Sequence, residues 1–138
     1  MIAQTEEDMR RFGRRLAGSL QAGDWISIDG PLGAGKTVLC KGILEGLGFT
    51  GEVTSPSYAI IHQYDPPEVK IRVIHADLYR IDDAAEIEQL GLDDQGDDCI
   101  TLVEWACRAA DLGKPSHRIK IDPMPNGFRK IETKIGDD

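Results

Sequence analysis

The segment from Gly30 to Thr37 constrains this chain more than any other. Its residues, Gly-Pro-Leu-Gly-Ala-Gly-Lys-Thr, match the pattern G-x-x-x-x-G-K-[ST] at every fixed position. The glycines let the backbone turn so that its N–H groups face an anion, and a helix beginning near Lys36 adds the positive end of its dipole. Lys36 supplies a mobile charge for the β- and γ-phosphates of a nucleotide, and the Thr37 hydroxyl is placed to bind Mg²⁺. The segment therefore predicts a phosphate-binding loop.

The neighbouring residues support this interpretation. The apolar run Trp25 to Asp29 predicts a short strand before the loop, and Lys36 to Leu47 predicts a helix that Gly48 ends. The mechanism of the loop requires both elements, whereas a chance glycine-rich turn needs neither. The residues of this region expected to contact the nucleotide are Gly30, Leu32, Gly33, Ala34, Gly35, Lys36, Thr37 and Val38.

The rest of the chain predicts a single α/β domain, residues 1–138. An N-cap at Thr5, with Asp8 three residues later, is followed by apolar residues at helical spacing, and we expect Gly23 to end that helix. Further strands are expected at 58–64, 71–76, 100–103, 117–121 and 129–135, with a short helix at 84–90. Asn126-Gly127 predicts a hairpin turn between the last two strands. The fold class is a P-loop NTPase-like, mostly parallel sheet flanked by helices, with an antiparallel C-terminal hairpin.

Two acids stand at the ends of apolar strands, where a P-loop protein holds Mg²⁺. Glu104 follows the run 100–103, and Asp77 follows the run 71–76. Either acid alone could be a solvated residue at a strand end, but two of them favour an arrangement in which both face the phosphates. Glu104 is the preferred Mg²⁺ ligand because its strand is the more apolar. The guanine-reading motif [NT]-K-x-D is absent, since the candidate segment 133–136 fails at its last position, and this favours ATP over GTP.

Composition narrows the classes of function. The formal net charge is −8, which argues against a broad nucleic-acid surface because such surfaces are basic. The cysteines form no C-x-x-C pair, so neither a disulfide framework nor a zinc site is expected, and reduced thiols are typical of the cytosol. The start of the chain is acidic, unlike a signal peptide, and no apolar run approaches the roughly 20 residues of a membrane span. We expect a cytoplasmic protein.

Four segments together resemble one protein family. They are Gly30 to Thr37, Val53-Thr54-Ser55-Pro56-Ser57-Tyr58, His75-Ala76-Asp77-Leu78-Tyr79-Arg80 and Leu102-Val103-Glu104-Trp105. In order and spacing they resemble the TsaE (YjeE) family, the small bacterial P-loop ATPases of tRNA threonylcarbamoyladenosine biosynthesis. The phosphate loop alone is unspecific, but the two segments that end at Arg80 and Trp105 are specific. The resemblance covers nearly the whole chain and is weakest after Trp105.

This resemblance implies ATP and Mg²⁺ as ligands and slow hydrolysis. It implies two partner proteins, the tRNA threonylcarbamoyl transferase (TsaD type) and its paralogous subunit (TsaB type), through which tRNA is met indirectly. In the family the transferase modifies the adenosine beside the anticodon, and the ATPase supports its turnover. The resemblance assigns Lys36 to the phosphates, Thr37 and Glu104 to Mg²⁺, and Asp77 to the functional aspartate. Lys36, Asp77 and Glu104 are therefore the expected catalytic residues.

Two further segments receive roles from the resemblance. The loop 54–57 stands where a switch-like loop approaches the γ-phosphate, and Thr5 and Glu6 match a region near the nucleotide base. The sequence departs from the family pattern at Pro31, Val38 and Cys107, none of which is a phosphate or metal ligand.

Other functions and residue roles stay open from the sequence. A small-molecule kinase also holds ATP on such a loop, but it needs an acceptor pocket and an arginine-bearing lid, and no lid insertion is visible. A nucleotide-gated binding module without significant turnover is the second alternative. His75 can be structural or catalytic, Tyr79 and Trp105 can pack in the core or bind a partner, and Arg80 can pair with an acid or a phosphate.

Overall fold

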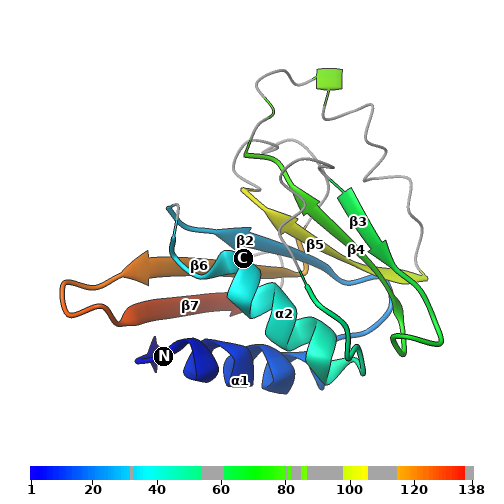
Figure 1. The fold of residues 1–138 in the computed structure, drawn as a ribbon. Coiled ribbons are helices and arrows are strands. Elements are labelled where there is room, and N and C mark those ends of the chain that lie inside the picture. The colour runs from blue at the N-terminus through cyan, green and yellow to red at the C-terminus, as the bar shows by residue number, and fades with distance from the viewer. Residues whose placement is uncertain are drawn as a thin grey trace.

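The computed structural model describes residues 1–31, 33–53, 61–79, 81, 85–86, 98–105 and 115–135. Within them, seven strands form one sheet in the order β1-β7-β6-β2-β5-β4-β3 (Figure 1). The strands are β1 (Ile2–Ala3), β2 (Trp25–Asp29), β3 (Ile61–Tyr64), β4 (Arg72–Asp77), β5 (Cys99–Glu104), β6 (His117–Pro123) and β7 (Arg129–Ile135). The helices are α1 (Glu6–Ala17) and α2 (Lys36–Gly46).

The centre of the sheet is parallel and both of its edges are antiparallel. β2 pairs in parallel with β5 and β6, and β4 pairs in parallel with β5. The predicted C-terminal hairpin is confirmed as the antiparallel pair β6–β7. The sequence did not indicate the second antiparallel edge, β3–β4, or the short β1 that pairs with β7. Since parallel strands end at the same edge, β2, β4 and β5 deliver their last residues to one place.

The start of α1 is as predicted, but its end is not. Thr5 caps the helix, and the Thr5 and Asp8 side chains form a reciprocal capping box. The prediction that Gly23 ends the helix is wrong, because α1 stops at Ala17. The Ser19 hydroxyl donates to the Leu16 carbonyl at 2.8 Å, which gives that carbonyl a partner outside the helix. Gly23 instead donates its N–H to the Cys99 carbonyl at 2.8 Å, at the start of β5.

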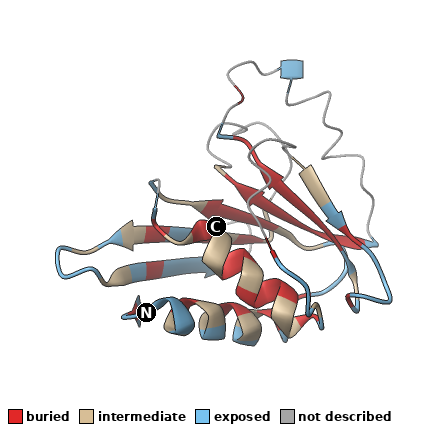
Figure 2. Cartoon of the chain, viewed as in Figure 1, coloured by how far each residue is buried: buried red, intermediate tan, exposed pale blue. Residues whose placement is uncertain are grey.

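Both helices lie on the same side of the sheet and pack against each other (Figure 1). Buried residues concentrate in the central strands and on the facing side of α2 (Figure 2). The helices approach so closely that a Cβ atom on Gly42 of α2 would lie 2.3 Å from the Arg10 carbonyl oxygen of α1. A bidentate ion pair between Arg10 and Glu45 flanks this crossing. The close contact fixes α1, and with it the segment that precedes Thr5.

Alternation along the strands sorts the side chains onto two faces. Ile26 and Ile28 of β2 and Leu102 of β5 belong to the core beneath α2, whereas Ile74 and Val103 belong to a second cluster on the opposite face. Side chains two residues apart share a face, so the residues that end β4 and β5 face α2 as well.

Several predicted features lie outside the described residues. They are Leu32, the loop 54–57, Arg80, Cys107 and most of the expected helix 84–90. Residues 58–60 of the predicted strand 58–64 also lie outside the described residues. The other predicted strands and the helix after the phosphate loop are observed, with boundaries that differ by up to two residues.

Candidate nucleotide-binding site

A cavity of about 540 Å³ opens where the phosphate loop meets the ends of β4 and β5. The N-terminal segment and the β6–β7 turn complete its wall. Ten predicted site residues line it: Thr5, Glu6, Gly33, Ala34, Gly35, Lys36, Thr37, Val38, Asp77 and Glu104. Sequence segments separated by almost the whole chain are thus brought to one cavity, and its volume lies in the range of small-molecule and cofactor sites.

The phosphate loop runs directly into α2. Gly35 precedes the helix with φ at 103°, a left-handed conformation that glycine adopts without steric cost. Lys36 and Thr37 are consequently the first residues of the helix, where backbone N–H groups lack partners within the helix. Such a helix start, at the rim of a cavity, suits an anionic phosphate group.

Lys36 is held inside the loop rather than extended into solvent. Its ammonium donates to the carbonyls of Gly30 at 2.6 Å and Pro31 at 2.9 Å, and the residue is 5% exposed. The same ammonium lies 4.1 Å from the centroid of the Trp105 ring, which is a cation–π contact. The ammonium of Lys36 is therefore held at the loop, and a phosphate group can draw it away from the two carbonyls.

Trp105 reaches the ammonium of Lys36 through an unusual turn. It follows β5 directly with φ at 60°, which is rare for a residue other than glycine. Its N–H donates to the Ile28 carbonyl at 3.0 Å, and its ring packs on Tyr79 with centroids 4.9 Å apart. The turn places the indole over Lys36, so Trp105 forms part of the cavity wall.

The two predicted metal ligands are neighbours. The Thr37 hydroxyl lies 3.3 Å and 3.4 Å from the two carboxylate oxygens of Glu104. Asp77 is opposite Glu104 in the register of β4 and β5, and its carboxylate accepts from the Tyr79 N–H at 2.9 Å. Both acids are buried, at 6% exposure for Asp77 and 2% for Glu104. A hydroxyl and two carboxylates give an all-oxygen donor set, which is the kind that Mg²⁺ prefers.

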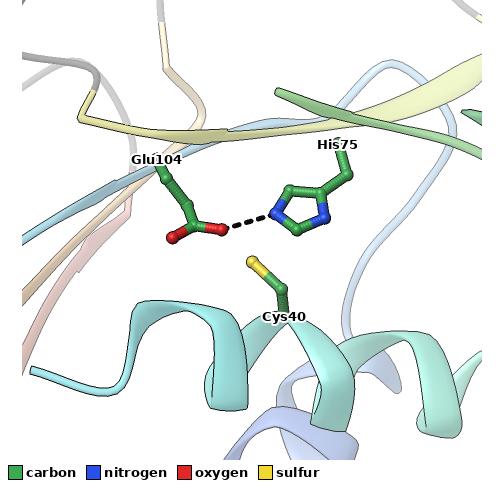
Figure 3. A group of neighbouring side chains, drawn as sticks. All are labelled: Cys40, His75 and Glu104. Atoms are coloured by element: carbon green, nitrogen blue, oxygen red, sulfur yellow. Dashed lines mark hydrogen bonds and ion pairs between the residues drawn. The ribbon is translucent and has the colours of Figure 1, made fainter. Parts of the chain in front are cut away.

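Two side chains lie behind Glu104, on the side away from the loop (Figure 3). His75 Nε2 lies 2.6 Å from Glu104 Oε2, and both side chains are buried. Cys40, from α2, points its thiol toward this pair. Burial, together with the carboxylates of Glu104 and Asp77, raises the pKa of the Cys40 thiol well above its ordinary value, so the thiol keeps its proton at neutral pH.

Sequence reasoning did not assign Arg129 to the site. This residue begins β7, and its guanidinium donates to the carbonyls of Ala34 and Gly33, each at 3.1 Å, and of Gly127 at 2.7 Å. Arg129 therefore ties the phosphate loop to the C-terminal hairpin. No local signal marks it, because more than ninety residues separate it from the loop and only the strand order joins them.

The fold and this cavity define an α/β protein of the P-loop NTPase-like class. The model of the family described as "Threonylcarbamoyl adenosine biosynthesis protein TsaE" matches residues 3–131. The chain therefore belongs to the TsaE family.

Individual proteins agree with this assignment. The tRNA threonylcarbamoyladenosine biosynthesis protein TsaE of Streptomyces coelicolor is 40% identical over 116 residues, covering 83% of this chain and 78% of that protein. The Bacillus subtilis protein of the same name is 40% identical over 119 residues, covering 83% and 70%. The crystal structure of Bacillus subtilis YdiB is similar with a TM-score of 0.82 at 31% identity, covering 99% of this chain and 84% of that one.

Neither described helix has the length and apolar character that crossing a membrane requires.

Proposed function

We propose that this protein binds ATP and Mg²⁺ in the 540 Å³ cavity and hydrolyses ATP slowly, in support of threonylcarbamoyladenosine formation in tRNA. The observation that carries the proposal is the grouping of Lys36, Thr37 and Glu104 at one wall of that cavity. They supply a cation for the phosphates, a hydroxyl and a carboxylate, which are the parts that P-loop hydrolysis needs.

Each residue receives a distinct task in this proposal. The loop backbone and Lys36 bind the phosphates, and Thr37 and Glu104 hold Mg²⁺. When bound, Mg²⁺ neutralises charge that develops on the phosphate oxygens. Asp77 lines the same cavity, and we assign it to orienting the attacking water. Thr5 and Glu6, from the N-terminal segment, line the same cavity, and we assign them to the base.

The charge distribution suggests dependence on a partner. Among the described residues, the arginine that lines the cavity is Arg129. Its guanidinium is hydrogen-bonded to carbonyls of the phosphate loop and of the C-terminal hairpin. An arginine finger is worth about 10³–10⁵ in hydrolysis rate, so without one we expect slow turnover. We propose that the transferase (TsaD type) and its paralogous subunit (TsaB type) bind this protein and change its rate. The net charge of −8 favours meeting tRNA through those proteins, in the cytoplasm, rather than directly.

The test is release of inorganic phosphate from ATP under three conditions: the purified chain alone, with tRNA, and with the transferase pair. We expect slow release alone, no response to tRNA, and a changed rate with the pair. Phosphate release without any acceptor also separates an ATPase from a kinase. Rapid turnover of the isolated chain, or stimulation by tRNA without protein, would contradict the proposal.

A further inference from the structure

Cys40, His75 and Glu104 form a buried cluster of three different ligand types (Figure 3). They come from α2, β4 and β5, and their thiol, imidazole and carboxylate ligand atoms all lie within 4.8 Å of one another. His75 and Cys40 are each 0% exposed, and Glu104 is 2% exposed. The three side chains converge because the inward face of the sheet and the facing side of α2 meet here.

The ligand nitrogen of His75 in this cluster is Nε2. It lies 2.6 Å from Glu104 Oε2, so it is the ring nitrogen that faces the carboxylate (Figure 3). A cation shared by the three side chains takes the place of this hydrogen bond and uses the same nitrogen and the same carboxylate as ligands.

The ligand chemistry selects a particular kind of cation. Sulfur and imidazole nitrogen favour Zn²⁺ and similar ions, whereas Mg²⁺ takes oxygen ligands. Bond lengths of about 2.0–2.3 Å place the ligand atoms of a tetrahedral Zn²⁺ roughly 3.5 Å apart, so the cluster needs side-chain shifts of about 1 Å. A thiolate, a carboxylate and a neutral imidazole carry two negative charges, which one divalent cation balances in this buried place.

We propose that Cys40, His75 and Glu104 bind a thiophilic divalent cation, with Zn²⁺ as the best fit. Three protein ligands leave one position for water, and the thiol proton of Cys40 passes to solvent when the cation binds. The cation reaches the cluster through the nucleotide cavity, because Glu104 lines that cavity.

Glu104 belongs to both sites, which couples them. Its carboxylate lies 3.3 Å from the Thr37 hydroxyl on one side and 2.6 Å from His75 on the other. A cation bound to the cluster turns this carboxylate away from Thr37. Zn²⁺ at the cluster and magnesium–nucleotide in the cavity therefore compete. This competition rests on the proposed function, whereas cation binding by the cluster does not.

The experiment uses Co²⁺ as a spectroscopic probe of the nucleotide-free, full-length protein. Coordination by Cys40 gives a thiolate-to-Co²⁺ charge-transfer band in the near ultraviolet, with tetrahedral bands in the visible. We expect Cys40→Ser to abolish the charge-transfer band and to weaken Zn²⁺ binding at least tenfold in competition with a chromophoric chelator. Cys99→Ser is the matched control, because Cys99 is also buried but belongs to the cluster on the opposite face of the sheet.

Absence of the band in the wild-type protein, or its persistence in Cys40→Ser, would overturn the proposal. His75→Ala gives a second check, since it should weaken Co²⁺ binding while the thiol remains. The titration needs no nucleotide, so its result does not depend on whether the protein hydrolyses ATP. Adding magnesium and a non-hydrolysable ATP analogue then tests the coupling, which predicts a lower Co²⁺ affinity.

Discussion

Replacing Lys36 by alanine removes the mobile positive charge of the phosphate loop. In the nucleotide-free protein this ammonium is held by two carbonyls, at 2.6 Å and 2.9 Å, and by the Trp105 ring at 4.1 Å. In the proposed function, ATP binding exchanges the two carbonyls for anionic phosphate oxygens. The variant loses that gain, so we expect Lys36→Ala to bind ATP much more weakly while keeping its fold.

The size of the effect follows from the contacts. A hydrogen bond to a charged group is worth about 1.5–3 kcal/mol, and each 1.4 kcal/mol is a factor of about ten in affinity. We therefore expect a dissociation constant about ten- to a hundred-fold higher. The carbonyl partners of Lys36 belong to Gly30 and the exposed Pro31, where water can replace the ammonium, so the free energy of unfolding should fall by only about 1–2 kcal/mol.

Titration calorimetry with Mg²⁺ and a non-hydrolysable ATP analogue measures this directly. Lys41→Ala is the matched control, because Lys41 lies on the same helix but does not line the cavity. We expect the control to keep the wild-type affinity. If Lys36→Ala bound the analogue as tightly as the wild type, or if both variants lost the same affinity, the phosphate-loop assignment would be refuted.

Four other substitutions test separate parts of the account. Glu104→Gln and Asp77→Asn should each lower the single-turnover hydrolysis rate more than they lower nucleotide affinity. The reason is that the proposed tasks of both acids matter most in the transition state. Full turnover in either variant would return that residue to a structural role. Arg129→Met should weaken nucleotide binding several-fold by calorimetry, since the loop carbonyls lose their anchor, and an unchanged affinity would remove Arg129 from the site. Gly42→Ala should lower the free energy of unfolding by about 1–3 kcal/mol through overpacking at the helix crossing. The exposed Gly18→Ala, by contrast, should be neutral or slightly stabilising in the same denaturant titration.

Local sequence patterns predicted the site residues that lie close together along the chain. The strand, loop and helix around Lys36 follow one another directly, so glycine spacing and apolar periodicity were sufficient. Glu104 and Asp77 were also predictable, because parallel strands that end in acids deliver them to the same edge. The C-terminal hairpin followed from Asn126-Gly127 for the same local reason.

Long-range contacts were beyond the reach of those patterns. Arg129 meets the phosphate loop only because β6 pairs with β2 and β7 with β6, an order that the sequence does not encode in any motif. The cluster at Cys40 was missed because its members are 35 and 29 residues apart and match no metal-binding spacing. The end of α1 was misjudged because the backbone after Ala17 tightens into i→i−3 hydrogen bonds from Gly18, Ser19 and Leu20, although the apolar spacing continues.

Formation of threonylcarbamoyladenosine over many cycles tests the central claim most directly. The transferase pair is supplied with tRNA and its donor substrate, and the modified nucleoside is quantified by mass spectrometry with this protein, with its Glu104→Gln variant, and with neither. We predict repeated modification only with the unaltered protein and ATP, and little beyond a single cycle per transferase otherwise. Equal yields with the Glu104→Gln variant, or without ATP, would contradict the claim that hydrolysis in this cavity supports the transferase.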